Sequence, residues 1–113
     1  MAKNPLPKRE EIIALFEIYS PLLSIECRER FLDYYYEDCS LSELAENYHV
    51  SRSAIHDGLS KTVSKLNAYE NKMGLLKKKK KLLEKLSEYQ TITNEEEKKK
   101  AFKELLEEIE NAI

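Results

Sequence analysis

Apolar residues recur along most of this chain at steps of three, four and seven positions, the spacing that gathers them on one face of an α-helix. In the first segment the pattern is carried by Ile12, Leu15, Phe16 and Tyr19. The same spacing continues to the end of the sequence with short interruptions. We expect about six helices, over residues 8–19, about 25–37, about 40–48, about 51–74, about 75–89 and from 94 onwards.

Capping residues stand where several of these helices are expected to begin. Ser24 and Ser51 can each accept a hydrogen bond from the free backbone N–H groups of a first helical turn. Ser40 and Glu43 form the S-x-x-E pattern of a capping box, in which two side chains satisfy each other's backbone donors. Asn94 repeats this pattern three residues before a glutamate. These signals support the helix boundaries drawn from the periodicity.

Glycine and proline are scarce, with two and three in 113 residues, so the chain lacks the turn residues of a β-rich fold. We therefore expect an all-α protein with a single compact domain. Gly74 stands within the long helical stretch that starts near residue 51, and it either ends or bends the helix there.

No apolar run reaches the roughly 20 residues that span a bilayer, and residues 1–11 are charged rather than apolar. We expect a cytoplasmic protein with no membrane contact. Cys27 and Cys39 are too few for a disulfide framework and lack the spacing of a zinc site. We expect both thiols to be reduced and buried.

The net charge of −2 conceals a segregation of charge along the chain. Residues 1–50 carry 5 positive and 10 negative side chains, residues 51–91 carry 10 and 4, and residues 92–113 carry 4 and 7. A polyanion would therefore meet the central segment, because phosphate contacts come from clustered lysine and arginine. Alternatively, the acidic C-terminal segment folds back onto it.

Residues 40–61 have the spacing of a helix-turn-helix motif, in which a capped short helix, a three-residue turn and a second capped helix follow directly. The small Ala45 allows the two helices to approach closely. His49 stands in the turn, where such motifs commonly carry glycine because the backbone is left-handed. We expect a helix-turn-helix domain over residues 1–74, including the start of the long helix, and a C-terminal helical extension over residues 75–113 in the same structural unit.

Three stretches of the chain resemble the YlxM or UPF0122 proteins of Gram-positive bacteria and mycoplasmas: LFEIYSPLLS at 15–24, FLDYYYEDCSLSELAENYHVSRSAIHDGL at 31–59, and LNAYENKMGLL at 66–76. The resemblance covers roughly residues 12–86, and the last 25 or so residues add nothing to it. It implies a fold similar to the helix-turn-helix of sigma-factor region 4 and a regulatory role without enzymatic activity. It also implies a link to the signal recognition particle (SRP) pathway, through RNA or protein components of the particle.

The second helix of a DNA-binding helix-turn-helix reads base edges from its first turns. Those turns contain basic and polar side chains here, whereas Asp57 repels phosphates unless it accepts from cytosine or pairs with Arg52 or Lys61. Glu43 and Glu46 on the preceding helix also oppose a docked duplex. The candidate nucleic-acid-binding residues are Arg52, Ser53, His56, Ser60, Lys61 and Lys65.

Five consecutive lysines at 77–81 form the strongest electrostatic feature of the sequence. Because five adjacent residues surround a helix, the run can attract phosphates but cannot read bases from one side. The alternative is a solvated helix surface balanced by nearby acidic residues. The candidate basic patch comprises Lys72, Lys77, Lys78, Lys79, Lys80, Lys81 and Lys85.

An apolar stripe along the long helical stretch extends further than a three-helix core would cover. The C-terminal helices could fold back over it, or the long helices of two chains could pair. We favour a homodimer whose interface is formed by Leu59, Leu66, Tyr69, Met73, Leu76 and Leu83.

Other kinds of chemistry have little support in the sequence. Tyr34, Tyr35 and Tyr36 point about 100° apart on a helix, so they cannot form one flat surface for stacking bases. His49 and His56 have no cysteine at ligand spacing, no histidine is matched with a nucleophile, and no glycine-rich phosphate loop occurs. We expect no metal, no cofactor, no small-molecule substrate and no enzymatic activity.

Two main functions remain open at this point. A regulatory helix-turn-helix protein would bind DNA through Arg52, Ser53 and His56. An adaptor of the SRP would instead bind the particle RNA through lysines at 72–81, with its acidic helices against the particle's protein subunit. The resemblance favours a regulatory role tied to the particle, and a structural homodimer without a nucleic-acid partner is the third possibility.

Overall fold

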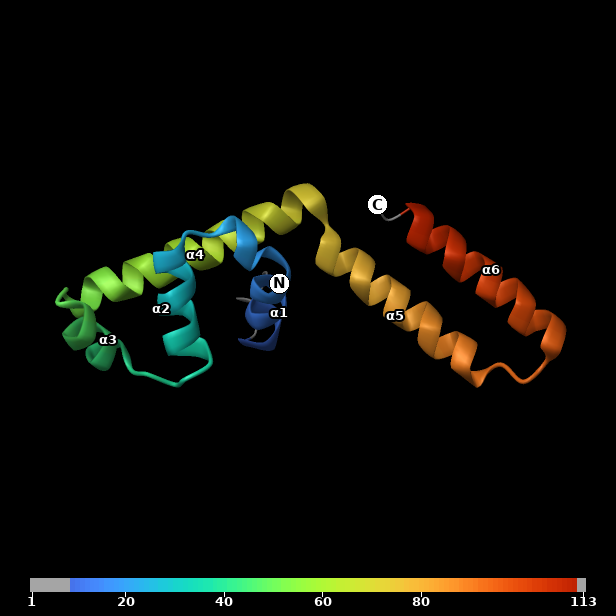
Figure 1. The fold of residues 1–113 in the computed structure, drawn as a ribbon, viewed down its shortest axis with the longest axis horizontal. Helices are drawn as coiled ribbons and strands as arrows, with labels where there is room; N and C mark the ends of the chain where they lie inside the picture. The colour runs from blue at the N-terminus through green and yellow to red at the C-terminus, as the bar shows by residue number, and fades with distance from the viewer. Residues whose placement is uncertain (1–8, 112–113) are drawn as a thin grey trace, which may run out of the picture. The chain divides into compact units, whose positions relative to one another are not determined.

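A computed structural model of the chain describes residues 9–111, so residue 8, expected at the start of the first helix, lies outside the described residues. Within that range the chain forms six α-helices and one short 3-10 helix, with no strand (Figure 1). This confirms the all-α class and the number of helices. The elements are α1 (Arg9–Tyr19), η1 (Ser20–Leu22), α2 (Ile25–Tyr35), α3 (Leu41–Tyr48), α4 (Arg52–Met73), α5 (Leu75–Thr91) and α6 (Glu95–Asn111).

Side-chain caps begin four of these helices, as the sequence predicts. The Ser40 hydroxyl accepts from the Glu43 N–H at 3.0 Å, and the Glu43 carboxylate accepts from the Ser40 N–H at 2.8 Å. The hydrogen bond from the Ser40 backbone lowers the pKa of Glu43. The capping box at the start of α3 is therefore complete. The other caps are Ser24 accepting from the Cys27 N–H, Ser51 from the Ala54 N–H, and Asn94 from the Glu96 and Glu97 N–H groups.

Three helices, α2, α3 and α4, end where the backbone becomes left-handed, at Asp38, His49 and Gly74. Gly74 has φ 63° and separates α4 from α5, so it ends the helix rather than bending it. The sequence predicts that the second helix extends to about residue 37, but α2 ends at Tyr35, and Asp38 has φ 57°. The Tyr36 and Glu37 N–H groups both donate to the Leu32 carbonyl, so the regular helical pattern is lost before residue 37. The left-handed Asp38 then prevents the helix from resuming.

The turn of the helix-turn-helix motif closes α3 with backbone hydrogen bonds. His49 has φ 57° and ψ 43°, the left-handed conformation expected at this position. Its N–H donates to the Glu46 carbonyl at 3.3 Å, and the Val50 N–H donates to the Ala45 carbonyl at 3.0 Å. This is the Schellman arrangement, which satisfies the last carbonyl groups of a helix and turns the chain sharply.

The chain divides into two compact units, Met1–Met73 and Gly74–Ile113. In the first unit, α1, α2 and α3 all pack against α4. Phe16 of α1 and Phe31 of α2 stack with their ring centroids 4.1 Å apart, and the Tyr19 hydroxyl donates to Glu70 on α4 at 2.6 Å. The buried side chains described in this unit are Ile12, Leu15, Phe16, Tyr19, Leu23, Phe31, Leu44, Ile55, Leu59, Thr62 and Leu66.

The second unit consists of α5 and α6, which lie side by side in opposite directions (Figure 1). Lys81 and Glu108 approach to 3.6 Å, and the rings of Tyr89 and Phe102 lie 6.0 Å apart. The acidic C-terminal helix therefore folds back onto the basic α5, one of the two arrangements expected from the charge pattern. Leu76 is the one buried side chain among the described residues of this unit.

The expectation that both cysteines are buried is wrong. Cys27 and Cys39 are free thiols, and each is half-buried. Cys27 lies in the first turn of α2. Cys39 lies in the loop before α3 and packs against the buried cluster of Leu44, Ile55 and Leu59. Within residues 9–111, no helix has the length and apolar character needed to cross a membrane.

We predict that His49→Gly raises the free energy of unfolding by about 0.5–1 kcal/mol, because glycine adopts the left-handed conformation without a Cβ clash. The measurement is urea unfolding of the wild-type and variant proteins. His49→Ala is the matched control and should bring no such gain, since alanine keeps the Cβ. Equal stability of the two variants would contradict the assigned strain.

Candidate nucleic-acid interface

The outer surface of α4 is defined by the side chains that the helix buries. Ile55, Leu59, Thr62 and Leu66 are buried and point into the first unit. Residues about half a turn away from them must therefore point outward, because successive residues are rotated by about 100° around the helix. The six candidate nucleic-acid-binding residues are all on α4 and all exposed.

These six residues do not form a single patch. Lys65 follows His56 by nine positions, which places it about half a turn away on the opposite side of the helix. The side that carries Arg52, His56 and Ser60 is called here the arginine flank. The opposite side carries Lys61, Lys65 and Lys72 at helical spacing and is called the lysine flank. Lys72, assigned from the sequence to the patch around residues 77–81, thus lies in line with two of the interface residues.

Between the two flanks runs an outer ridge of Ser53, Asp57 and Ser64, spaced by four and seven residues. All three side chains are exposed. Asp57 pairs with neither of the basic partners considered from the sequence. Its carboxylate lies 3.7 Å from Nδ1 of His56, an ion pair only when the histidine is protonated. The centre of the ridge is therefore acidic, and the positive charge lies beside it.

The lysine flank borders the start of α2. A hydrogen bond with Ser24 lowers the pKa of the Cys27 thiol, with smaller contributions in the same direction from Thr62 and Lys65. These interactions bring the first turn of α2 next to the middle of α4. The lysine flank is therefore supported by two packed helices.

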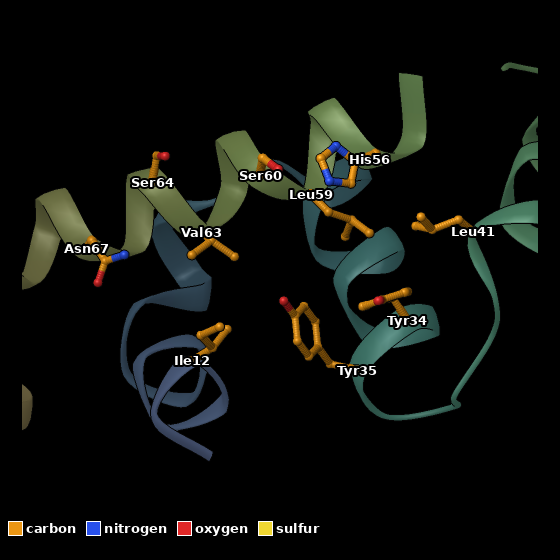
Figure 2. Close-up of a pocket in the computed structure, with 10 residues that line it drawn as sticks. All are labelled: Ile12, Tyr34, Tyr35, Leu41, His56, Leu59, Ser60, Val63, Ser64 and Asn67. Atoms are coloured by element: carbon orange, nitrogen blue, oxygen red, sulfur yellow. The ribbon is translucent and has the colours of Figure 1, made fainter. Parts of the chain in front are cut away.

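The arginine flank borders two hollows in the surface of the first unit. One, of about 470 Å³, lies between the start of α3 and the first turns of α4, lined by Leu41, Arg52, Ser53, His56 and Asp57. The other, called here the side groove, has a volume of about 440 Å³ and lies between α1, α2 and α4 (Figure 2). Figure 2 shows its lining residues, which are Ile12, Tyr34, Tyr35, Leu41, His56, Leu59, Ser60, Val63, Ser64 and Asn67.

Tyr34, Tyr35 and Tyr36 do not form a stacking platform, as the sequence predicts. Tyr35 lines the side groove. Its ring stacks on Phe31 with the centroids 4.3 Å apart, and the guanidinium group of Arg9 lies over it at 5.0 Å. Tyr34 meets it edge-on at 5.0 Å, and the Tyr36 hydroxyl bonds to a carboxylate on α1. The Tyr35 ring is thus packed against its neighbours and is half-buried.

The first helix of the motif is tied to α2 by Tyr48. The Tyr48 hydroxyl donates to the Asp33 carboxylate at 2.8 Å, and the Arg30 guanidinium lies over the Tyr48 ring at 4.7 Å. The bond to Asp33 raises the pKa of Tyr48 to about 12. Leu44, Ile55 and Leu59 form the apolar contact between α3 and α4. Together these contacts fix the angle at which α4 is presented.

The residues assigned to a dimer interface have different environments. Leu59 and Leu66 are buried in the first unit and Leu76 is buried as well, so a folded chain cannot offer these three to a second copy. Tyr69 is half-buried and its hydroxyl donates to the Leu22 carbonyl at 3.4 Å. Only Met73 and Leu83 of the six are exposed, and they lie on different helices because the stripe is interrupted at Gly74.

The lysines at 77–81 are all exposed on α5, with Lys81 facing Glu108, and Lys85 is half-buried. They surround the helix, as expected for five adjacent positions. No group of three or more histidine, cysteine, aspartate or glutamate side chains in the described part of the chain is arranged to hold a metal ion.

Comparison with known proteins connects this geometry to a family. A family model described as "Putative helix-turn-helix protein, YlxM / p13 like", named UPF0122, matches residues 6–109. The UPF0122 protein YlxM of Bacillus subtilis is 38% identical over 108 residues, which cover 93% of this chain and 98% of the relative. A UPF0122 protein of Geobacillus kaustophilus is 38% identical over 74% of this chain and 79% of its own length, and one of Malacoplasma penetrans is 43% identical over 56% and 59%.

The family match extends beyond the part of the chain in which the sequence alone shows a resemblance. It includes α5 and nearly all of α6, whereas the resemblance seen in the sequence covers roughly residues 12–86. The last residues lack distinctive motifs because α6 consists mainly of charged positions around an apolar stripe. The matched description is that of a helix-turn-helix family and not of an enzyme family.

We predict that Tyr48→Phe lowers the free energy of unfolding by about 1–2 kcal/mol at neutral pH, because it removes a hydrogen bond to a charged acceptor. The folded protein holds the phenol proton more tightly than the unfolded chain does. The stabilisation is therefore complete below the ordinary tyrosine pKa of 10.0 and is lost as the pH rises through about 12.

The measurement is urea unfolding of both proteins at neutral pH and at a series of alkaline values. Tyr69→Phe is the matched control, since its bond to the Leu22 carbonyl is longer, at 3.4 Å, and exposed. A difference between wild type and Tyr48→Phe that stayed constant with pH would refute the role given to the Asp33 bond.

Proposed function

Because the chain belongs to the UPF0122 family of helix-turn-helix proteins, we propose that it is a non-enzymatic regulatory protein that binds duplex DNA through the outer surface of α4. The observation that carries this proposal is the division of that surface into two flanks on either side of a narrow ridge. A helix lying in the major groove turns its ridge to the base edges and its two sides to the phosphates of the two strands. The positions of Arg52 on one side and Lys61 and Lys65 on the other fit this geometry.

The hollows beside the arginine flank support the same docking. A sugar–phosphate strand needs room next to the helix that enters the groove. The side groove and the hollow at the start of α3 provide such room beside His56, which lines both. Phosphate contacts there fix the position of the protein, while sequence is read on the ridge.

The ridge itself favours DNA over duplex RNA. The major groove of A-form RNA is too deep and narrow for a helix to enter, whereas that of B-form DNA accepts one. Ser53 and Ser64 can donate to or accept from base edges, and Asp57 can accept from the amino group of cytosine. An acidic residue at this position also weakens binding to unspecific sequence, which raises the specificity of the site.

We predict that Lys65→Gln lowers affinity for duplex DNA equally for all sequences and reduces the slope of log K against log salt by about 1. Asp57→Asn should instead raise the affinity for a random duplex, because it removes repulsion from the phosphates. Fluorescence anisotropy with a labelled duplex at several salt concentrations measures both.

Lys103→Gln on α6 is the control for the loss of one positive charge on a helix outside the helix-turn-helix motif, and it should leave the slope unchanged. If Lys65→Gln and Lys103→Gln behave alike, the lysine flank does not contact phosphate. If Lys65→Gln behaves as predicted, selection of bound duplexes from a random pool would next identify the sequence that Ser53 and Asp57 prefer.

A second candidate function is favoured by the lysines of α5. In this alternative the protein takes part in the SRP pathway, with residues 77–81 on the particle RNA and its acidic helices against the particle's protein subunit. The exposure of all five lysines supports sequence-independent attraction to phosphates. Both candidates place the protein in the cytoplasm.

We predict, for this candidate, that replacing residues 77–81 with glutamine weakens binding to the particle RNA and flattens its salt dependence. Glutamine is a good helix former, so α5 should remain helical, which circular dichroism would check. Lys65→Gln should leave RNA binding unchanged while it weakens binding to DNA. Unaltered affinity and slope for the RNA after the five substitutions would exclude this function of α5.

We also propose that the protein acts as a homodimer, since two linked copies of a helix-turn-helix bind two half-sites of a duplex. Of the residues assigned to the interface from the sequence, Met73 and Leu83 remain available for it.

A further inference from the structure

The second unit has an apolar surface that its own two helices leave uncovered. Among its described residues α6 buries no side chain, and α5 buries only Leu76. Exposed fractions between 39% and 53% are found for Leu83, Leu86, Phe102, Leu106 and Ile109. A contiguous apolar patch rimmed by charged residues is typical of an interaction site.

These five residues lie on the same face of the hairpin. Each of them directly follows a half-buried residue, at positions 82, 85, 101, 105 and 108. Because Glu108 meets Lys81 of α5, we take these half-buried positions to mark the sides on which the two helices meet. When a helix is viewed from its N-terminus, each residue is rotated by about 100° clockwise from the residue before it. Because α5 and α6 run in opposite directions, this rotation carries both exposed rows to the same side. We call this surface the hairpin face.

We infer that the hairpin face binds the hairpin face of a second copy of this chain, forming a four-helix bundle. This inference rests on the homodimer proposed above and names its interface. Two hairpins packed face to face would bury all five exposed residues, which α5 and α6 cannot do alone. Bundles of this kind pack antiparallel neighbours around an apolar core.

The charges of the two helices determine which helices become neighbours. In α5, six lysines outnumber two glutamates, whereas in α6 seven glutamates outnumber four lysines. If the two-fold axis runs parallel to the helices, α5 of one copy lies beside α6 of the second copy. If the axis runs in the interface perpendicular to the helices, the two copies of α5 lie beside each other. The first arrangement pairs opposite charges and the second pairs like charges, so we assign the first.

One charge pair across this interface can be identified from the register of the hairpin. Lys81 lies level with Glu108. Lys79, two residues earlier on α5, is therefore level with Glu110, two residues later on the antiparallel α6. Lys79 precedes Leu83 by one turn at the hairpin face, and Glu110 follows Ile109 directly. In the assigned arrangement, Lys79 of one copy meets Glu110 of the other.

The test measures the mass of the full chain by sedimentation equilibrium at micromolar concentration. Wild-type protein should have twice the 13.3 kDa mass of one chain. Leu106→Glu and, as a second variant on the other helix, Leu83→Glu should each sediment as the single chain. Circular dichroism should show wild-type helix content, because both side chains are exposed in one copy.

Ile25→Glu is the matched control, since Ile25 is a 67% exposed apolar residue of the first unit and lies outside the hairpin face. It should leave the dimer intact. A wild-type protein with the mass of one chain would overturn the inference, and so would a dimer that survives both Leu106→Glu and Leu83→Glu. The second result would leave the homodimer standing with a different interface.

Charge reversal tests the arrangement of helices. Lys79→Glu and Glu110→Lys should each weaken the dimer at low salt, and the two together should restore it. Failure of the double variant to restore the dimer would overturn the pairing of α5 with α6 of the second copy. DNA binding by Leu106→Glu is measured separately, so loss of the dimer with α4 still contacting DNA distinguishes this inference from the proposed function.

Discussion

The burial of one side of α4 is the constraint on which the rest of the first unit depends. Ile55, Leu59, Thr62 and Leu66 occupy that side, and α1, α2 and α3 all pack against it. Full burial of an isoleucine or leucine side chain stabilises a fold by about 1.5–3 kcal/mol, so the three aliphatic positions tolerate few changes. Because α4 is one continuous helix of 22 residues, the side that it buries also determines which of its residues face outward.

The contacts of α3 show how local hydrogen bonds orient the motif. The capping box at Ser40 fixes where α3 begins, and the left-handed residue His49 fixes where it ends. Between these points, Leu44 enters the core and Tyr48 reaches Asp33 on α2. The first helix of the motif is thereby held at both ends and along its middle, so the start of α4 has one orientation relative to the core.

Much of this architecture can be predicted from the sequence because its signals are local. Caps, the apolar period and the left-handed turn each depend on a few neighbouring residues, and all of them appear in the structure at the expected places. The interface residues could be listed but not arranged, because their separation into two flanks depends on which side of α4 is buried. Leu59 and Leu66, which the sequence assigns to the dimer interface, are buried within the first unit. Periodicity could not predict this, because it does not distinguish a helix face covered by its own chain from one covered by another chain.

The scarcity of buried side chains in α5 and α6 has a consequence for local stability. Backbone amides are protected from hydrogen exchange by the free energy of the smallest opening that exposes them. In the first unit that opening disrupts a shared core, whereas in the second it requires the loss of few apolar contacts. A single chain should therefore exchange its amide hydrogens in two kinetic classes divided near Gly74, with proteases cutting first on the C-terminal side. Association through α5 and α6 would slow both processes there, so the same segment that completes an assembly would also control how long the chain survives in a cell.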